Sequence, residues 1–165
     1  MKRVIVIGCP GSGKSVFSRE LHRVTGLPLC HLDQLRWNAD RTFVSREVLL
    51  ERLTPILASE HWIIDGNYAS TMELRMQACD TVVFLDYPTD VCVDGYLSRR
   101  GIPRPDMPWV ENPDEIDSEF LGLIQSYRDD QRPAVLALLE HYPDKRKIIF
   151  TKREEATEFL AGLER

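Results

Sequence analysis

The sequence predicts an α/β fold in which a parallel sheet of five strands carries helices on both faces. Five unbroken apolar runs, beginning with Val4–Ile7, are typical of strands that are buried on both sides. A segment with helical spacing of apolar residues follows each run, and this alternation favours parallel strands joined by right-handed crossovers. A chain of 165 residues, 43% of them hydrophobic, has room for one core, so we expect a single domain over residues 1–165.

A glycine-rich loop directly after the first strand is the strongest functional signal. Residues 8–15 match the pattern G-x-x-x-x-G-K-[ST], in which backbone N–H groups bind phosphates, Lys14 reaches the β- and γ-phosphates and the Ser15 hydroxyl binds Mg²⁺. The apolar positions Phe17 and Leu21 predict a helix directly afterwards, which places the phosphate at a helix N-terminus. The alternative is a glycine-rich turn that merely joins the strand to the helix. Such a turn would not need a Lys-Ser pair at the start of the helix. We expect phosphate contacts from Gly8, Pro10, Gly11, Ser12, Gly13, Lys14, Ser15 and Val16.

Leu27–Asp33 is predicted as a second short strand that ends in a carboxylate. Ligands of open α/β sheets lie beyond the carboxyl ends of the strands, so Asp33 is placed to contact a substrate, with His31 and Trp37 on the same segment. The alternative is that Asp33 only caps the next helix and that Trp37 packs in a surface groove. That helix is expected over about residues 45–60.

The third strand, His61–Gly66, also ends in an acidic residue. A carboxylate at this position suits Mg²⁺, which keeps several waters and takes one or two protein carboxylates along with phosphate oxygens. We therefore expect Asp65 to bind Mg²⁺ or a water of its shell, and a turn-forming Asp-Gly pair is the alternative. The following helix, with Met72 and Met76, carries Arg75, for which a phosphate contact and a solvated position are both open.

The fourth strand is predicted over Ala78–Pro88, and a helix from about Thr89 brings Arg99 and Arg100 to its end. Asp86 is expected to be structural. The helix dipole alone could explain two arginines at a helix C-terminus. Beside a phosphate site they would also form a clamp for a transition state.

Residues 101–117 differ in composition from the rest of the chain, because four prolines exclude regular structure. A long irregular loop in a compact domain is commonly either functional or disordered. We expect residues 101–132 to form a lid-like segment. The remaining elements are a helix through residues 120–127, a charged cluster with Arg128 and Arg132, a helix through residues 135–139, a strand over Lys147–Thr151 and a closing helix from Glu154 to Leu163.

The overall charge and the cysteines limit the classes of function. A formal net charge of -5 gives no general attraction for nucleic acid or anionic membranes. The four cysteines are far apart without a C-x-x-C pair, which favours small buried side chains in a reducing compartment over a zinc site or disulfides. Met1–Arg3 leads straight into the first strand and no long apolar run occurs, so we expect a cytoplasmic protein. The oligomeric state stays open.

At the level of motifs, the chain resembles the adenylate-kinase-like P-loop kinases over nearly its whole length. Ile63–Gly66 looks like the Asp-Gly strand tip of nucleotide kinases, and residues 85–100 look like their strand and helix leading into the lid. Four motifs together, at residues 8–15, 31–33, 64–68 and 104–108, resemble those of the small proteins known as DNA topology modulation proteins. The resemblance implies a P-loop NTPase three-layer sandwich with a lid insertion.

The same resemblance implies roles for single residues. It places Gly8, Gly11, Gly13 and Lys14 on the phosphates, Ser15 and Asp65 at the metal, Asp33 in the substrate region, and Arg99 and Arg100 at the lid hinge. Two positions depart from the adenylate kinase pattern. Asn67 and Tyr68 occupy the region of an arginine that binds the acceptor monophosphate, so Arg75 would have to replace it, and we expect Asn67 and Tyr68 to contact substrate. Gly95 replaces an adenine-stacking arginine, which leaves base recognition to residues 151–153.

These observations predict a kinase that uses ATP and Mg²⁺ to phosphorylate a small acceptor. Phosphoryl transfer depends on positioning and charge neutralisation. Asp33 would orient or deprotonate an acceptor hydroxyl. Nucleosides, nucleotides, sugars and other hydroxylated metabolites all stay open as acceptors. The competing class is an NTP-dependent switch or regulator with a DNA-related role, which the acidic balance disfavours. We expect catalytic roles for Lys14, Asp33, Arg99, Arg100, Arg128 and Arg132.

Overall fold

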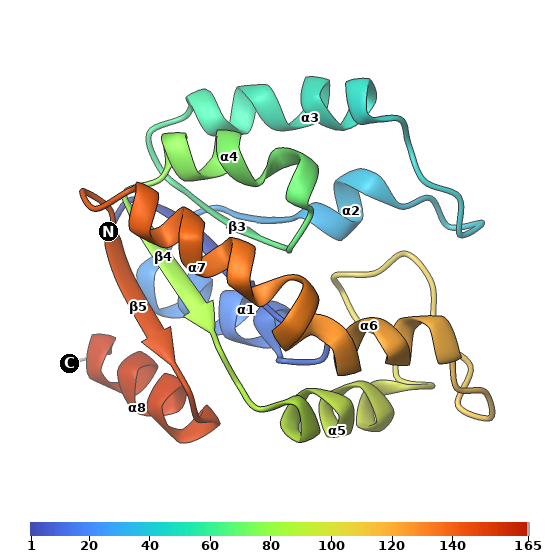
Figure 1. Ribbon diagram of the computed structural model, residues 1–165. Coiled ribbons are helices and arrows are strands. Elements are labelled where there is room, and N and C mark those ends of the chain that lie inside the picture. The colour runs from blue at the N-terminus through green and yellow to red at the C-terminus, as the bar shows by residue number, and fades with distance from the viewer. Residues whose placement is uncertain (165) are drawn as a thin grey trace.

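The computed structural model describes residues 1–164, which form five strands and eight helices. The order of these elements follows the predicted alternation (Figure 1). The strands are β1 (Arg3–Gly8), β2 (Leu29–His31), β3 (Trp62–Asp65), β4 (Thr81–Leu85) and β5 (Arg146–Phe150). The helices are α1 (Lys14–Thr25), α2 (Leu32–Arg36), α3 (Arg46–Ala58), α4 (Ala69–Ala78), α5 (Thr89–Arg99), α6 (Ser118–Asp130), α7 (Arg132–His141) and α8 (Arg153–Leu163).

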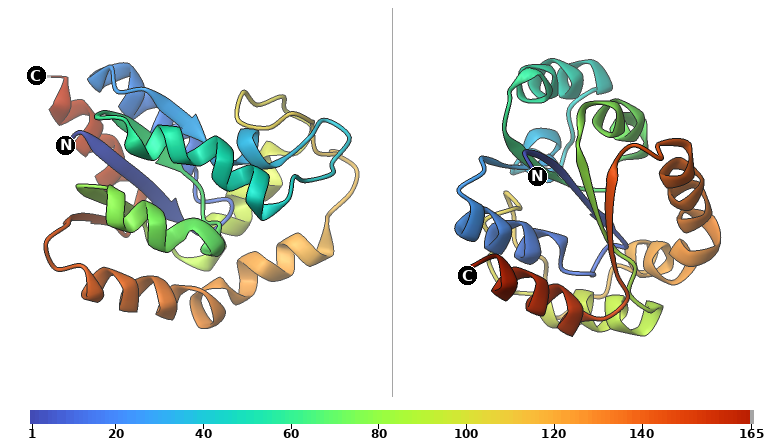
Figure 2. Two further views of the ribbon diagram at one scale, coloured as in Figure 1. Left: turned by 90° about the horizontal axis from the view of Figure 1, so that it is seen from above. Right: turned by 90° about the vertical axis from the view of Figure 1, so that its left-hand side faces the viewer.

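The five strands form one parallel sheet in the order β2-β3-β1-β4-β5. The central strand β1 pairs with β3 through Val4 and Ile63 and with β4 through Val4 and Thr81, and the apolar residues of β1 are completely buried. Helices cover both faces of the sheet, with α1 and α8 on one side and α4 and α7 on the other (Figure 2). The predicted three-layer α/β arrangement is therefore confirmed.

Two predicted strands are wrong at their ends. The second strand stops at His31, because its partner β3 ends at Asp65, which is paired with His31, and Gly66 then turns away with a φ of 131°. Leu32–Arg36 forms a short helix instead, so Asp33 lies in the first turn of α2 rather than at a strand tip. The fourth strand is also shorter than Ala78–Pro88, since Ala78 ends α4 and Pro88 caps α5.

The carboxyl ends of the strands gather the segments that carry the sequence motifs. Helices α2 and α5 and the loop of residues 101–117, hereafter the proline-rich loop, lie together at this end of the sheet (Figure 2, left). The loop is closed at its base by a hydrogen bond from the Gly101 amide to the Glu111 carbonyl (2.7 Å). Among residues 1–164, no helix has the length and apolar character needed to cross a membrane.

Candidate functional site

The glycine-rich loop has the backbone geometry of an anion site. Gly11 and Gly13 have φ values of 82° and 92°, which side chains other than glycine rarely adopt. Gly13 caps α1 without any side-chain hydrogen bond, so the first N–H groups of that helix point at the loop without a side-chain partner. The Lys14 ammonium donates to the carbonyls of Gly8 (3.0 Å) and Cys9 (3.1 Å), and its burial lowers the pKa of Lys14. The loop therefore offers N–H donors and one cation to a phosphate chain.

Helix α5 supports this loop by direct contact between backbones. A Cβ atom added to Gly95 would lie 2.0 Å from the Gly11 carbonyl oxygen, and one added to Gly11 would lie 2.1 Å from the Cys92 carbonyl oxygen. Arg153, at the start of α8, donates to the Gly11 carbonyl (3.4 Å) and lies over the Tyr87 ring at 5.5 Å. Close packing against Gly11 therefore explains why position 95 is a glycine rather than the arginine of the adenylate kinase pattern. Arg153 of α8 lies beside this glycine.

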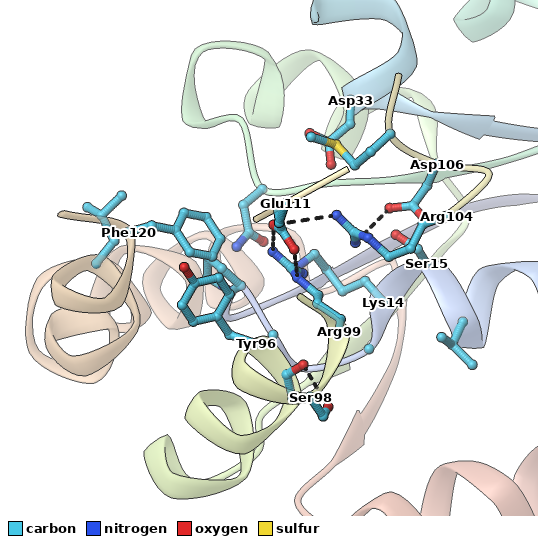
Figure 3. A pocket seen from close by; sticks show the side chains of 18 of the residues that line it. Lys14, Ser15, Asp33, Tyr96, Ser98, Arg99, Arg104, Asp106, Glu111 and Phe120 are labelled. Atoms are coloured by element: carbon cyan, nitrogen blue, oxygen red, sulfur yellow. Dashed lines mark hydrogen bonds and ion pairs between the residues drawn. The ribbon is translucent and has the colours of Figure 1, made fainter. Parts of the chain in front are cut away.

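A cavity of about 1400 Å³ runs from the glycine-rich loop to the proline-rich loop (Figure 3). Its walls come from α1, α2, α5, the segment after β3, the proline-rich loop and the start of α8. The cavity brings together most of the residues that the sequence predicted for nucleotide and substrate. Those on its wall are Pro10, Gly11, Gly13, Lys14, Ser15, Val16, Asp33, Trp37, Asn67, Tyr68 and Arg99.

Asp33 lies on the wall of this cavity although it belongs to a helix. The Tyr68 hydroxyl donates a hydrogen bond to Asp33, and the Trp37 indole nitrogen donates to the Tyr68 hydroxyl (2.9 Å). Burial raises the pKa of Asp33, while the bond from Tyr68 and the charge of Lys14 act in the opposite direction. No side-chain hydrogen bond caps α2, so Asp33 does not serve as the cap of that helix.

Several predicted site residues lie behind the cavity wall instead. The backbone of Gly8 and the side chain of Ser12 are buried beneath the loop. His31 and Asp65 are buried and form a hydrogen-bonded pair (Nδ1 to Oδ2, 2.8 Å), and the expected contact of Asp65 with Mg²⁺ or with a water of its shell stays a prediction. Their position follows from the register that pairs the ends of β2 and β3.

Arg75 holds the backbone after β3 and does not reach the cavity. It is fully buried and donates to the carbonyls of Gly66 (2.9 Å) and Tyr68 (3.0 Å) and to the Thr71 hydroxyl (3.1 Å). Burial lowers the pKa of Arg75 to about 10. The arginine expected to replace the acceptor-phosphate ligand therefore fixes the segment that carries Tyr68.

The predicted arginine clamp is only partly assembled. Arg99 lies on the cavity wall, whereas Arg100 points to the Glu115 carbonyl (2.8 Å). Arg132 makes two hydrogen bonds of 2.8 Å to the buried Asp86 carboxylate, and Arg128 lies 3.6 Å from the same group. Because Asp86 raises the pKa of Arg132 and holds it in place, the two arginines join α6 and α7 to the end of β4.

A chain of ion pairs crosses the cavity, and sequence reasoning did not anticipate it. Arg19 contacts Asp106 (3.3 Å), Asp106 contacts Arg104 (3.1 Å), Arg104 approaches Glu111 (3.7 Å) and Glu111 binds Arg99 (3.0 Å). Figure 3 shows Glu111 between the two arginines. One arginine and two acidic residues, at positions 104, 106 and 111, were the available signal, but their partners Arg19 and Arg99 lie outside this stretch of sequence.

The side chains at this site suit a Mg²⁺ ion that takes most of its ligands from phosphate and water. Residues 1–164 contain no cluster of three or more His, Cys, Asp or Glu side chains that could hold a metal. The Ser15 hydroxyl lies on the cavity wall at the start of α1, beside the phosphate-binding loop. This donor set suits an ion that takes most of its ligands from a nucleotide and solvent, as Mg²⁺ does at phosphate sites.

Comparisons with known proteins support the fold. A shikimate kinase from Bacteroides thetaiotaomicron matches with a TM-score of 0.57 and 19% identity, over 99% of this chain and 96% of that one. A gluconokinase from Sinorhizobium meliloti 1021 matches with a TM-score of 0.56 and 18% identity, over 98% and 91%. No protein-family model and no curated protein matches the chain. The fold is therefore a P-loop NTPase α/β fold.

Proposed function

We propose that the protein is an ATP-dependent phosphotransferase that transfers the γ-phosphoryl group to a small acceptor. The observation that carries the proposal is the position of the Asp33 carboxylate, on the wall of the same cavity as Lys14 and Ser15. A nucleotide switch needs the phosphate loop but has no use for a general base in front of it. Both solved structures described above are named as kinases, which supports the same class of reaction.

In the proposed reaction, an acceptor oxygen attacks the γ-phosphorus, the bond from that phosphorus to the β,γ-bridging oxygen breaks, and ADP leaves. Asp33 accepts the proton of the acceptor hydroxyl. Because burial raises the pKa of Asp33, its carboxylate is a stronger base than that of a free aspartate. Mg²⁺, held by Ser15, would neutralise phosphate charge when bound.

Residues of this chain supply the remaining positive charge and the positioning. Lys14 is close enough to the loop to exchange its two carbonyl partners for β- and γ-phosphate oxygens. Arg99, at the end of α5, also lies on the cavity wall, where Glu111 balances its charge. The proline-rich loop acts as a lid, since its Glu111 holds Arg99 and its Asp106 holds α1 through Arg19. Arg153 and the ring of Tyr87 form the surface for the nucleotide base.

Labelled ATP tests the proposal directly. We expect the protein to bind ATP with Mg²⁺ and to transfer γ-labelled phosphate to one class in a panel of nucleosides, nucleotides, sugars and hydroxy acids. Lys14→Ala should reduce transfer by at least about a hundredfold, because one charged donor to the transferring group is lost. Lys147→Ala, in β5 and away from the cavity, is the matched control and should behave as the wild type. ATP hydrolysis without transfer to any acceptor would favour the nucleotide-dependent switch.

A further inference from the structure

The arginines near the transfer point are already neutralised by carboxylates. Arg19 and Arg104 share Asp106, whose side chain is 1% exposed, and Arg99 and Arg104 share Glu111. A phosphate group on the acceptor would have to displace one of these carboxylates and leave a buried negative charge without its partner, which is costly. This end of the cavity therefore suits a neutral reacting group, a hydroxyl, rather than an acceptor phosphate.

Several polar side chains near Asp33 already have hydrogen-bond partners in the backbone or in other side chains. Gln34 donates to the Pro105 carbonyl, Asn67 exchanges two hydrogen bonds with Gly8, and Trp37 donates to Tyr68. A polyol with several hydroxyl groups would find few free partners here, and each hydroxyl buried without one costs free energy. The acceptor therefore carries fewer hydroxyl groups than a sugar or a polyol.

Three polar groups at this end of the cavity keep hydrogen-bonding capacity. Within residues 1–164, only one oxygen of Asp33 accepts a hydrogen bond, and the buried indole Nε1 of Trp109 has no partner at all. Arg41 forms no ion pair within the same residues and makes a single long hydrogen bond to the Val110 carbonyl (3.4 Å). These three groups thus offer one carboxylate oxygen, one N–H donor and one guanidinium.

Aromatic side chains separate these three groups and give the region flat surfaces. The rings of Trp37 and Trp109 meet edge to face at 6.2 Å, and Phe43 lies 5.5 Å from Trp37. The Arg41 guanidinium lies over the Trp109 ring at 4.9 Å. Arg41 has a positive φ (67°) because it lies in the tight turn between Asn38 and Thr42, and this turn carries its side chain to the cavity wall.

Resting on the proposed function, we propose that the acceptor is a heteroaromatic alcohol, in which a hydroxyl group is joined by a short linker to a flat ring with nitrogen or carbonyl acceptor atoms, as in nucleosides. The ring packs against Trp37 and Trp109, and its acceptor atoms bind Trp109 Nε1 and Arg41. The hydroxyl faces Asp33, which takes its proton as the new oxygen–phosphorus bond forms and ADP leaves. Recognition comes from stacking and two donors rather than from a network of sugar hydroxyls.

A panel of four acceptor pools tests the class. The pools contain heteroaromatic alcohols (ribonucleosides, deoxyribonucleosides and pyridoxine), nucleoside monophosphates, sugars and polyols, and hydroxy acids including shikimate and gluconate. With γ-labelled ATP, we expect label only in the first pool. Transfer to monophosphates, polyols or hydroxy acids would overturn this inference and leave the kinase function standing. Failure to transfer to any pool would overturn both.

Variants at the ring site test the residues with the compound so found. Trp109→Leu and Arg41→Ala should each raise its KM about tenfold, since stacking on an aromatic ring is worth one to two powers of ten. The KM for ATP should stay within twofold. Arg46→Ala is the matched control, because Arg46 is also exposed and also makes one 3.4 Å hydrogen bond to a carbonyl, outside the cavity. An unchanged acceptor KM in both ring-site variants would refute the assignment.

Discussion

Replacing Gly95 with alanine tests how the phosphate loop is held. A Cβ atom at this position would lie 2.0 Å from the Gly11 carbonyl oxygen, whereas ordinary contact begins at 3.4 Å. The loop or helix α5 must therefore move by about 1.4 Å. Since the obstructing atoms belong to the backbone, no side chain can rotate away to relieve the contact.

The expected effect on nucleotide binding is larger than the effect on stability. Alanine is favoured over glycine inside a helix by about 1 kcal/mol, which offsets part of the strain in the folded state. A shift of about 1.4 Å, however, moves the loop N–H groups out of hydrogen-bond range of a phosphate. Misplacement of about 1 Å at a reacting centre costs on the order of a hundredfold in rate, about 2.7 kcal/mol. We expect this loss in kcat/KM for ATP.

Titration calorimetry with ATP, transfer of labelled phosphate and thermal unfolding together separate these effects. Gly122→Ala makes the same change in α6, where an added Cβ would meet nothing within 4 Å. This control should be as stable as the wild type or slightly more so, with unchanged ATP affinity. If a folded Gly95→Ala variant binds ATP as tightly as the wild type, α5 does not hold the loop and the reasoning is refuted.

Four further predictions concern Asp33, Tyr68 and two arginines that lie behind the cavity wall. Asp33→Asn should lower transfer by a factor of about 10² to 10⁴ and abolish the acid limb of the kcat/KM profile, because the raised pKa of Asp33 sets the pH below which the base is protonated. Tyr68→Phe removes a hydrogen bond that lowers this pKa, so the limb should move to higher pH, and an unmoved limb would contradict the role of Tyr68. Arg75→Met should reduce the free energy of unfolding in urea by about 2 to 4 kcal/mol, because the carbonyls of Gly66 and Tyr68 lose their donor. Arg132→Ala should reduce it by about 1 to 3 kcal/mol, with phosphoryl transfer near the wild-type rate; a large loss of transfer in the folded variant would restore Arg132 to the catalytic group.

Much of the fold could be predicted because its signals are local. The buried strands appear as continuous apolar runs, and residues 8–15 specify their own turn and the helix after it. The N-terminus of α3 is also local, since the Ser45 side chain accepts a hydrogen bond from the Val48 amide (3.2 Å) as the capping pattern predicts. The end of β2 is different, because it depends on where the neighbouring strand β3 stops.

The site was harder to predict because charge partners are set by tertiary contacts. Arg132 and Asp86 are 46 residues apart, and Arg19 and Asp106 are 87 apart. Nothing near an arginine in the sequence indicates whether it faces a phosphate or a carboxylate. The sequence around Arg75 also does not show whether this arginine is exposed or buried, because the residues of α4 have only a weak amphipathic pattern.

The pairing of these arginines changes the expected electrostatics of the reaction. Of the arginines predicted to act on phosphate, only Arg99 lies on the cavity wall, and Glu111 already binds it. Lys14, Arg153 and the N-terminus of α1 are then the positive groups next to the loop that no carboxylate among residues 1–164 neutralises, so a triphosphate must draw mainly on them and on Mg²⁺. Around Arg19, Arg99 and Arg104, this charge balance leaves little positive potential for a second anion. The same ion pairs that hold the proline-rich loop in place therefore favour a neutral acceptor, and they do so through Asp106 and Glu111 rather than through the phosphate loop itself.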